Sequence, residues 1–186
     1  RSHLRFGLQG RHNLSNLLAA LAVVSEFGLT CEEVATAAAF FRPSGLRTEI
    51  VHLADGTVLL NDSYNAAPSS MEGALGVLSA AEGRRVAVLG DILELGEAEE
   101  AYHRQVGRAA AESGVELLVA VGERSRALAE AARLAGLPQV FWASDREEGW
   151  RRLRAEVRPG DTVLIKASRG IGLDLLAERL QGDWKR

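Results

Sequence analysis

Short apolar runs alternate with segments of helical periodicity through most of this chain, and that alternation restricts its fold more than any other feature. Strands are predicted at Thr48–Leu53, Thr57–Leu60, Arg85–Leu89, Leu117–Val121, Val140–Trp142 and Thr162–Ile165. Helices are predicted at about Ser69–Ala81, Glu97–Ser113, Arg124–Ala135, Glu147–Glu156 and Ile171–Leu180. Strands separated by helices of this length imply a mostly parallel sheet with right-handed crossovers. We therefore predict a Rossmann-like α/β fold with helices flanking the sheet.

The first two predicted strands are joined by Asp55-Gly56, a dipeptide that is favoured in tight hairpin turns. We therefore expect Thr48–Leu53 to lie antiparallel at the edge of the otherwise parallel sheet. The helix that follows this hairpin is predicted to begin with a capping box formed by Ser69 and Glu72.

The first 44 residues show a different pattern. Apolar residues alternate with polar residues or glycine over residues 4–8, which predicts a short strand. Asn13 is predicted to cap a helix that ends at Gly28. A second helix is predicted to run to about Phe41, with Thr30 and Glu33 forming the capping box at its start.

One strand and two helices bury too little apolar surface to fold alone. We therefore expect residues 1–44 to be the C-terminal tail of a larger domain, and residues 45–186 to form the Rossmann-like domain. The segment Arg42-Pro-Ser-Gly45 is the predicted hinge between them, because proline and glycine interrupt regular structure there.

The composition argues against several classes of protein. The 186 residues carry a net charge of −3 without a basic stripe, so nucleic acid is not an expected partner. The single cysteine, Cys31, rules out an internal disulfide and fits a reducing compartment. The longest apolar run, Leu17–Val24, is too short to span a bilayer, and no signal peptide opens the chain. We expect a cytoplasmic protein without membrane insertion.

Polar clusters stand at the ends of the predicted elements. They are Gly10–Asn16, before the first helix, and Asn61–Asn65, Gly90–Gly96 and Lys166–Arg169, each after a strand. The carboxyl ends of parallel strands meet at one edge of a sheet, where ligands bind, so the last three clusters predict one shared site. Helix N-termini and glycine-rich turns at that edge favour anions.

Each cluster also has a structural explanation that the sequence leaves open. His12 and Asn13 can serve as helix caps, and Asp62 can close a turn through its own backbone. Asp91 and Glu94 fit solvated loop acids, and His103, inside a helix, fits a surface or packing residue. Lys166 and Arg169 flank a serine, which suits a clamp for carboxylate or phosphate as well as a surface ion pair.

Several spaced motifs, in order along the chain, resemble those of the Mur ligase family. They are Gly10-Arg-His-Asn13 with Asn16, Gly45-Leu-Arg47, Asp62-Ser-Tyr-Asn65, Pro68 and Ser70-Met71. A second group is similar to the members that add D-alanyl-D-alanine: Gly90-Asp91, Glu94-Leu-Gly96, His103, Gly107 and Lys166 with Ser168-Arg169. The resemblance covers nearly the whole chain, and an ordered series of motifs is more specific than any single one.

The resemblance implies a three-domain ligase of peptidoglycan precursor synthesis, with a UDP-substrate domain, a central ATPase domain and a C-terminal Rossmann-like domain. ATP would phosphorylate a carboxylate of a UDP-N-acetylmuramoyl tripeptide, and the amine of D-alanyl-D-alanine would attack the acyl phosphate. Mg²⁺ would offset the crowded negative charge of the phosphates.

The resemblance also implies roles for single residues. Asn16 would hydrogen-bond the adenine of ATP, with His12 and Asn13 on the same wall. Arg47 would reach the phosphates, and Asp62 would accept from the ribose hydroxyls. Asn65 would face the dipeptide or the nucleotide with Tyr64 beside it, and Lys166, Ser168 and Arg169 would hold the anionic dipeptide or the reacting phosphate. No role follows for Asp91, Glu94 or His103.

Two residues depart from the family pattern, and one motif is absent. Ala67 stands where asparagine is usual, which removes a polar contact, and Ala167 replaces a usual glycine, which constrains a turn. The phosphate-binding sequence Gly-x-x-x-x-Gly-Lys-Ser/Thr does not occur in the chain. We therefore expect the C-terminal part of a longer enzyme, with no complete catalytic set or metal site of its own and no activity alone.

Two alternatives remain open. One is another ATP-dependent amide ligase of the same architecture, of Mur or folylpolyglutamate type, which a screen of amine substrates would separate. The other is a non-catalytic nucleotide-binding module that shares the fold without the chemistry. A phosphate-binding loop upstream of this chain would favour the ligase over the module.

Overall fold

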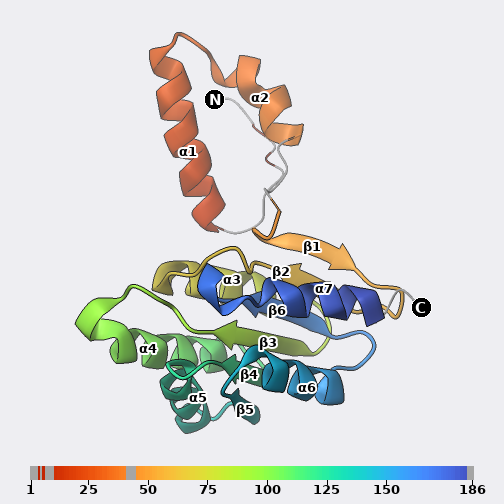
Figure 1. Ribbon diagram of the computed structural model, residues 1–186. Coiled ribbons are helices and arrows are strands. Elements are labelled where there is room, and N and C mark those ends of the chain that lie inside the picture. The colour runs from red at the N-terminus through yellow and green to blue at the C-terminus, as the bar shows by residue number, and fades with distance from the viewer. Residues whose placement is uncertain (1–3, 5, 7–10, 41–44, 184–186) are drawn as a thin grey trace. The chain divides into compact units, whose positions relative to one another are not determined.

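A computed structural model describes residues 4, 6, 11–40 and 45–183, without the side chains of Arg11 and His12 (Figure 1). The chain divides into two compact units, Arg1–Ser44 and Gly45–Arg186. Of the strand predicted at residues 4–8, only residues 4 and 6 are described, and neither is assigned to a strand. Of the hinge predicted at residues 42–45, all but Gly45 lie outside the described residues.

The first unit contains helices α1 (Arg11–Glu26) and α2 (Cys31–Phe40). The capping box of α2 is confirmed: the Thr30 backbone N–H donates to Glu33 Oε2 at 2.7 Å, and the Glu33 N–H donates to Thr30 Oγ1 at 3.4 Å. The bond from the Thr30 backbone lowers the pKa of Glu33 below its ordinary value. The predicted cap at Asn13 is wrong, because α1 begins two residues earlier and contains Asn13. Gly28 has the expected left-handed backbone, with φ of 77°.

The second unit contains a six-stranded sheet in the order β1-β2-β6-β3-β4-β5. The strands are β1 (Glu49–His52), β2 (Val58–Asn61), β3 (Arg85–Gly90), β4 (Leu117–Val121), β5 (Gln139–Ala143) and β6 (Thr162–Lys166). β1 pairs antiparallel with β2 at the edge, and all other pairs are parallel. The predicted mostly parallel sheet with an antiparallel edge strand is confirmed.

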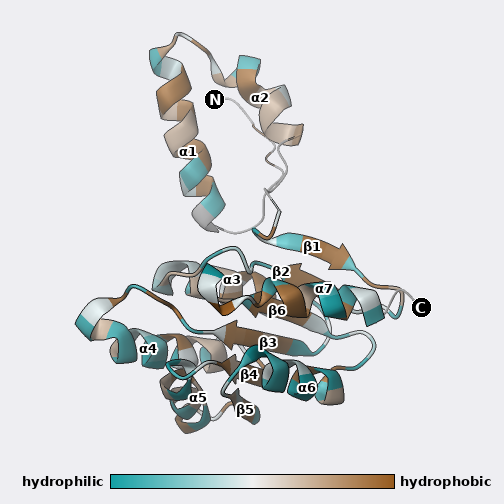
Figure 2. Ribbon diagram, in the orientation of Figure 1, coloured by the Kyte–Doolittle hydropathy of each residue, from teal (hydrophilic) through white to brown (hydrophobic). Residues whose placement is uncertain are grey.

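Helices cover both faces of this sheet (Figure 1). They are α3 (Pro68–Ser79), α4 (Glu99–Glu112), α5 (Ser125–Leu134), α6 (Arg146–Glu156) and α7 (Asp174–Asp183), with 3₁₀ turns η1 (Gly96–Ala98) and η2 (Arg169–Ile171). Alternate residues of β3 point to opposite faces of the sheet. Ala87 and Leu89 join the apolar core under α3, α4 and α5, whereas Val86 and Val88 join the core under α6 and α7. Most of β3 is correspondingly apolar in Figure 2.

The starts of α3 and α7 are built differently from the prediction. α3 begins at Pro68, and the hydroxyl of Ser70 accepts from the Ala67 N–H at 3.0 Å, so the Ser69–Glu72 box is not formed. Glu72 instead accepts from Gln105 Nε2 at 2.7 Å. The last helix begins at Asp174 rather than near Ile171, because Gly172, with φ of 71°, ends a 3₁₀ turn first.

Candidate functional site

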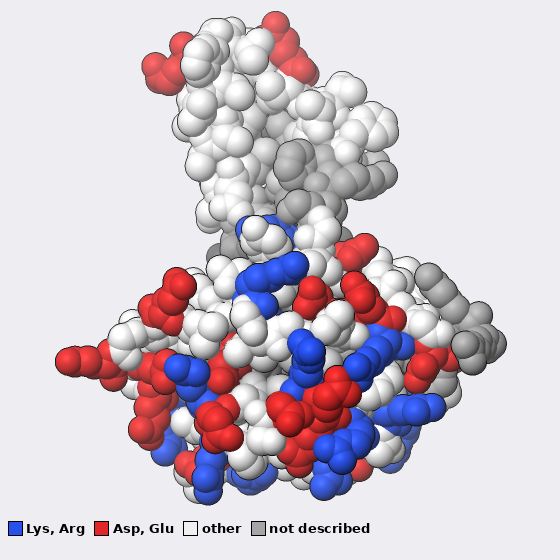
Figure 3. All heavy atoms as spheres, viewed as in Figure 1, with Lys and Arg blue, Asp and Glu red and all other residues white. Residues whose placement is uncertain are grey.

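The three polar clusters predicted to share a site follow β2, β3 and β6. β6 lies between β2 and β3 and pairs parallel with both, so the carboxyl ends of these strands meet at one edge. The prediction that the clusters lie on one edge of the sheet is confirmed. On the face of this unit seen in Figure 3, side chains of both charges are interspersed.

A buried ion pair stands at the centre of this edge. Lys166 Nζ donates to Asp62 Oδ2 at 2.6 Å and to the Asn65 carbonyl at 2.9 Å, with a longer contact of 3.5 Å to the Asp62 carbonyl. The Lys166 side chain is 3% exposed and that of Asp62 14%. Because an ammonium has three donors, these acceptors satisfy Lys166 from within the protein. Of the two cations that flank Ser168, Lys166 is therefore paired within the protein, whereas Arg169 is exposed.

The other Asp62 oxygen holds the segment that precedes β1. Asp62 Oδ1 accepts from the Thr48 N–H at 2.8 Å, and the Tyr64 N–H donates to the Leu46 carbonyl at 3.0 Å. Leu46 and Thr48 have left-handed backbones, with φ of 64° and 49°. The sequence contained no signal for this arrangement, because neither residue type favours a positive φ.

Two exposed arginines approach the ring of Tyr64. The Arg47 guanidinium carbon lies 4.2 Å from the ring centroid, and that of Arg169 lies 5.8 Å from it. Arg169 also lies 3.4 Å from Asp174. Guanidinium groups bind carboxylates and phosphates in a bidentate manner. The edge therefore presents two guanidinium groups, those of Arg47 and Arg169, beside the Tyr64 ring, which is 43% exposed. The side chain of Asn65, the next residue, is also exposed.

Ser168 ties two of the clusters together. Its hydroxyl accepts from the Leu93 N–H at 2.9 Å, and its own N–H donates to the Asp91 carbonyl at 3.0 Å. Ser168, which was predicted to contact the substrate, is thus only 4% exposed. Its hydroxyl is already bonded to the loop that follows β3.

The same loop gives structural roles to two of the residues for which the family resemblance implied none, Asp91 and His103. Asp91 is 3% exposed and caps α5, since its Oδ1 accepts from the Ser125 N–H at 2.7 Å. His103 is fully buried; its Nε2 accepts from the Ile92 N–H at 3.1 Å, and its Nδ1 lies 2.7 Å from the Glu99 carbonyl. Glu94 is exposed, with φ of 64°. Asp91 is therefore a buried cap rather than a solvated acid, and His103 a packing residue.

The candidate adenine residues of the first unit lie at an apolar cavity. Asn13 and Asn16 line it and are joined by a bond of 3.2 Å from Asn16 Nδ2 to Asn13 Oδ1. The cavity has a volume of about 410 Å³ and is otherwise lined by Phe6, Leu17, Ala20, Leu21, Val24, Val34, Ala37 and Ala38. The side chain of His12 lies outside the described residues.

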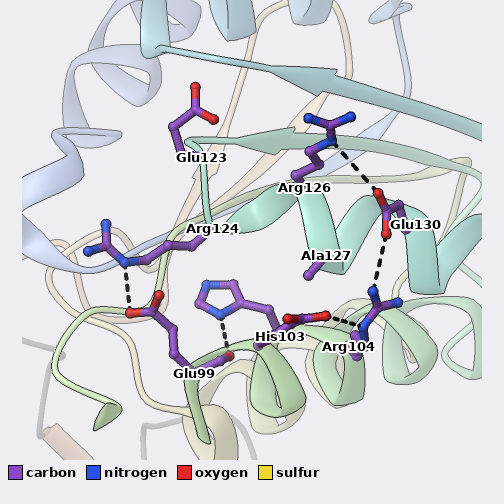
Figure 4. A pocket seen from close by; sticks show the side chains of 9 residues that line it. Glu99, His103, Arg104, Glu123, Arg124, Arg126, Ala127 and Glu130 are labelled. Carbon is purple, nitrogen blue, oxygen red and sulfur yellow. Dashed lines mark hydrogen bonds and ion pairs between the residues drawn. The ribbon is translucent and has the colours of Figure 1, made fainter. Parts of the chain in front are cut away.

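A separate, charged cavity of about 670 Å³ lies between α4 and α5 (Figure 4). Glu99 accepts from Arg124 at 2.7 Å and raises the pKa of that guanidinium; Arg104 likewise pairs with Glu100 at 2.9 Å, and the pKa of Arg104 is raised. Glu130 lies 3.2 Å from Arg104 and 3.7 Å from Arg126. The arginines of this cavity are thus neutralised by its own glutamates.

Metal-binding clusters and membrane-spanning helices are both absent from the described residues. In the parts of the chain that the structure describes, no group of three or more His, Cys, Asp or Glu side chains is placed to hold a metal ion. No helix among these residues is both long enough and apolar enough to cross a bilayer.

A mostly parallel sheet whose central strands end in polar loops, with helices on both faces, defines the second unit as a Rossmann-like domain. The model of the family described as "Mur ligase, glutamate ligase domain" matches residues 46–169. The chain therefore belongs to the Mur ligase family.

Individual relatives agree with this assignment. The UDP-N-acetylmuramoyl-tripeptide–D-alanyl-D-alanine ligase of Mycobacterium leprae is 38% identical over 201 residues, covering 98% of this chain and 39% of that protein. A crystal structure of MurF from Acinetobacter baumannii superposes with a TM-score of 0.84 at 29% identity, covering 97% of this chain and 40% of that one. MurF of Thermotoga maritima in complex with ADP has the same fold, with a TM-score of 0.81 at 22% identity over 96% of this chain and 40% of that one. The chain thus spans about two fifths of the length of these relatives.

Proposed function

We propose that this chain is the C-terminal part of an ATP-dependent ligase that joins D-alanyl-D-alanine to a UDP-N-acetylmuramoyl tripeptide. The observation that carries the proposal is the 38% identity, over 98% of the chain, to a relative named for that reaction. Such a ligase supplies a peptidoglycan precursor in the cytoplasm, a step on which cell-wall growth, cell shape and division depend.

The first unit is proposed to be the tail of the central ATPase domain. Its support is the lack of any buried residue among the described side chains of α1 and α2, in contrast to the core of the second unit. Leu14, Leu18 and Val23 on α1 are more than half exposed, as are Phe27 and Phe40. A unit with so many exposed apolar side chains and no buried core needs apolar surface from another part of the protein.

ATP and Mg²⁺ are the proposed cofactors, with the metal ligands coming mostly from outside this chain. His12, Asn13 and Asn16 are proposed to contact the adenine, and an asparagine suits that task because its amide offers both a donor and an acceptor. Arg47 is proposed to contact the ATP phosphates and Asp62 the ribose. Bound ADP in the Thermotoga maritima MurF supports a nucleotide as the ligand.

The dipeptide or the reacting phosphate is proposed to bind beside Tyr64, Asn65, Lys166, Ser168 and Arg169. Arg169 and Asn65 have exposed side chains that can contact a ligand directly. Lys166 and Ser168 are bonded within the protein, so their contribution is to hold the edge in shape.

The test uses the longer protein that contains this chain. ADP formation with ATP, Mg²⁺ and the UDP-tripeptide should require an amine and should be fastest with D-alanyl-D-alanine. The 186-residue chain alone should form no ADP. Preference for a single amino acid such as glutamate, or turnover by the isolated chain, would contradict the proposal.

A further inference from the structure

The segment Leu46–Thr48 is held in a conformation that its residues do not favour. Leu46 and Thr48 both lie in the left-handed region, with φ of 64° and 49°. This region is disfavoured for residues with a Cβ, and it is unusual for a β-branched residue such as threonine. Such backbone persists only where its surroundings enforce it, and it concentrates at functional sites.

Asp62 bonds directly to this segment. Its Oδ1 accepts from the Thr48 N–H at 2.8 Å and lies 3.4 Å from the Thr48 hydroxyl. Its Oδ2 is fixed by Lys166 at 2.6 Å, at the end of the central strand β6. The Tyr64 N–H secures the other side of the segment through the Leu46 carbonyl.

Arg47 is the residue that this arrangement presents. It lies between the two left-handed residues, and its guanidinium stands 4.2 Å from the Tyr64 ring centroid. Among the described residues no carboxylate pairs with Arg47, in contrast to Arg84, Arg104, Arg124 and Arg179. The enforced backbone therefore holds a cation in place without neutralising it.

We propose that Asp62 and Thr48 are positioning residues that act through Arg47: the Lys166–Asp62 pair locks Leu46–Thr48 and so preorganises the Arg47 guanidinium for an anionic phosphate group. This inference rests on the proposed function, in which Arg47 contacts the ATP phosphates. It does not require Asp62 to touch the nucleotide. If Asp62 acts through Arg47, its substitution should have little effect once Arg47 is removed, whereas direct contact of Asp62 with the ribose should give the same loss with or without Arg47.

The test is a double-mutant cycle in the longer enzyme, measured as kcat and KM for ATP. Thr48→Pro fixes φ near −65° and removes the N–H that Asp62 accepts, so it excludes the left-handed backbone. Asp62→Asn keeps the size but loses the charge partner of Lys166. Misplacing a positioned group can cost up to about 10²-fold, so each change should lower kcat/KM roughly tenfold or more. In an Arg47→Ala background, the same changes should alter kcat/KM by less than about twofold, since contacts that act together are not additive.

The matched control is Asp161→Asn. Asp161 lies just before β6, at its opposite end, and pairs with Arg84 at 2.8 Å with a side chain that is 4% exposed. This substitution breaks a similarly buried ion pair, so it should lower the melting temperature and leave the kinetic constants unchanged.

Additive losses in the Arg47→Ala background would overturn the inference and favour direct contact of Asp62 with the nucleotide. Wild-type kinetics in both single variants would also overturn it. If Asp62→Asn does not fold, Thr48→Pro decides alone, because it leaves the Lys166–Asp62 charge pair in place. If the proposed function itself is wrong, the result is different: the wild-type enzyme will show no ADP formation that depends on D-alanyl-D-alanine.

Discussion

A Cβ atom on Gly90 would lie 2.7 Å from the Cβ of Ala167, closer than two such atoms can approach. Ala167, where the family usually has glycine, is fully buried and has no left-handed backbone. The methyl group of Ala167 therefore fits because Gly90, on the neighbouring strand β3, has no side chain. The backbone of Ala167 itself is not in the left-handed region.

Gly90→Ala should destabilise the protein by about 1–3 kcal/mol through overpacking. The loss should be smaller in an Ala167→Gly background, because the methyl group in its way is gone, although Leu173 and Ile171 still crowd the position. Urea unfolding of the four variants measures this coupling, and equal losses in both backgrounds would show that Ala167 is not the obstacle.

Gly122→Ala should be more damaging than an ordinary substitution of a left-handed glycine. Gly122 has φ of 107°, and an added Cβ would meet the Asp91 carboxylate at 2.5 Å, where Asp91 caps α5. Gly136→Ala is the control, with φ of 87° and open space around it. The control should lose about 1–2 kcal/mol from backbone strain alone. A loss for Gly122→Ala no larger than this, in thermal or urea unfolding, would argue against the packing of Asp91 on Gly122.

His103 should be neutral, with its proton on Nδ1. The Ile92 N–H donates to Nε2, which leaves Nδ1 to donate to the Glu99 carbonyl. Correlation of ring nitrogens and protons by NMR should show a protonated Nδ1 and a bare Nε2. His103→Leu should cost about 1–3 kcal/mol, because a buried N–H loses its acceptor, and should speed hydrogen exchange at Ile92. The opposite tautomer would contradict this geometry.

Lys166→Met should destabilise the protein by roughly 3 kcal/mol, because it leaves the Asp62 carboxylate without its counter-charge. Adding Asp62→Asn should restore part of that loss by removing the unpaired charge. Guanidinium unfolding of the single and double variants is the measurement. A double variant less stable than Lys166→Met would mean that the carboxylate needs no partner.

The ion pair between Glu147 on α6 and Arg179 on α7 should make the free energy of unfolding depend on pH in the acid range. The two terminal nitrogens of the Arg179 guanidinium, Nη1 and Nη2, each donate to the Glu147 carboxylate at 2.7 Å, and these bonds lower the pKa of Glu147. A lowered folded-state pKa means that this contribution is present above the ordinary glutamate pKa and is lost as the pH falls through the folded-state value. The stability difference between wild type and Glu147→Gln should therefore shrink towards zero in acid. A difference that is unchanged at low pH would contradict the pairing.

The sequence by itself determined the order and type of the elements in the second unit. Apolar runs and helical periodicity are local properties, and helical crossovers force the strands between them to run parallel. The meeting of the clusters after β2, β3 and β6 followed from this, because parallel strands end at a common edge. The turn at Asp55-Gly56 placed β1 antiparallel for an equally local reason.

Only the tertiary structure decided which partner each polar group takes. Lys166 was a plausible ligand clamp by composition, but its ammonium meets Asp62, 104 positions earlier in the chain. Asp91 caps a helix that begins 34 positions later, and the left-handed backbone at Leu46 and Thr48 exists because Asp62 and Tyr64 hold it. A charged group is satisfied by whatever lies within about 3 Å in space. Sequence periodicity sets which way a side chain points, and the packing of distant elements sets what it meets there.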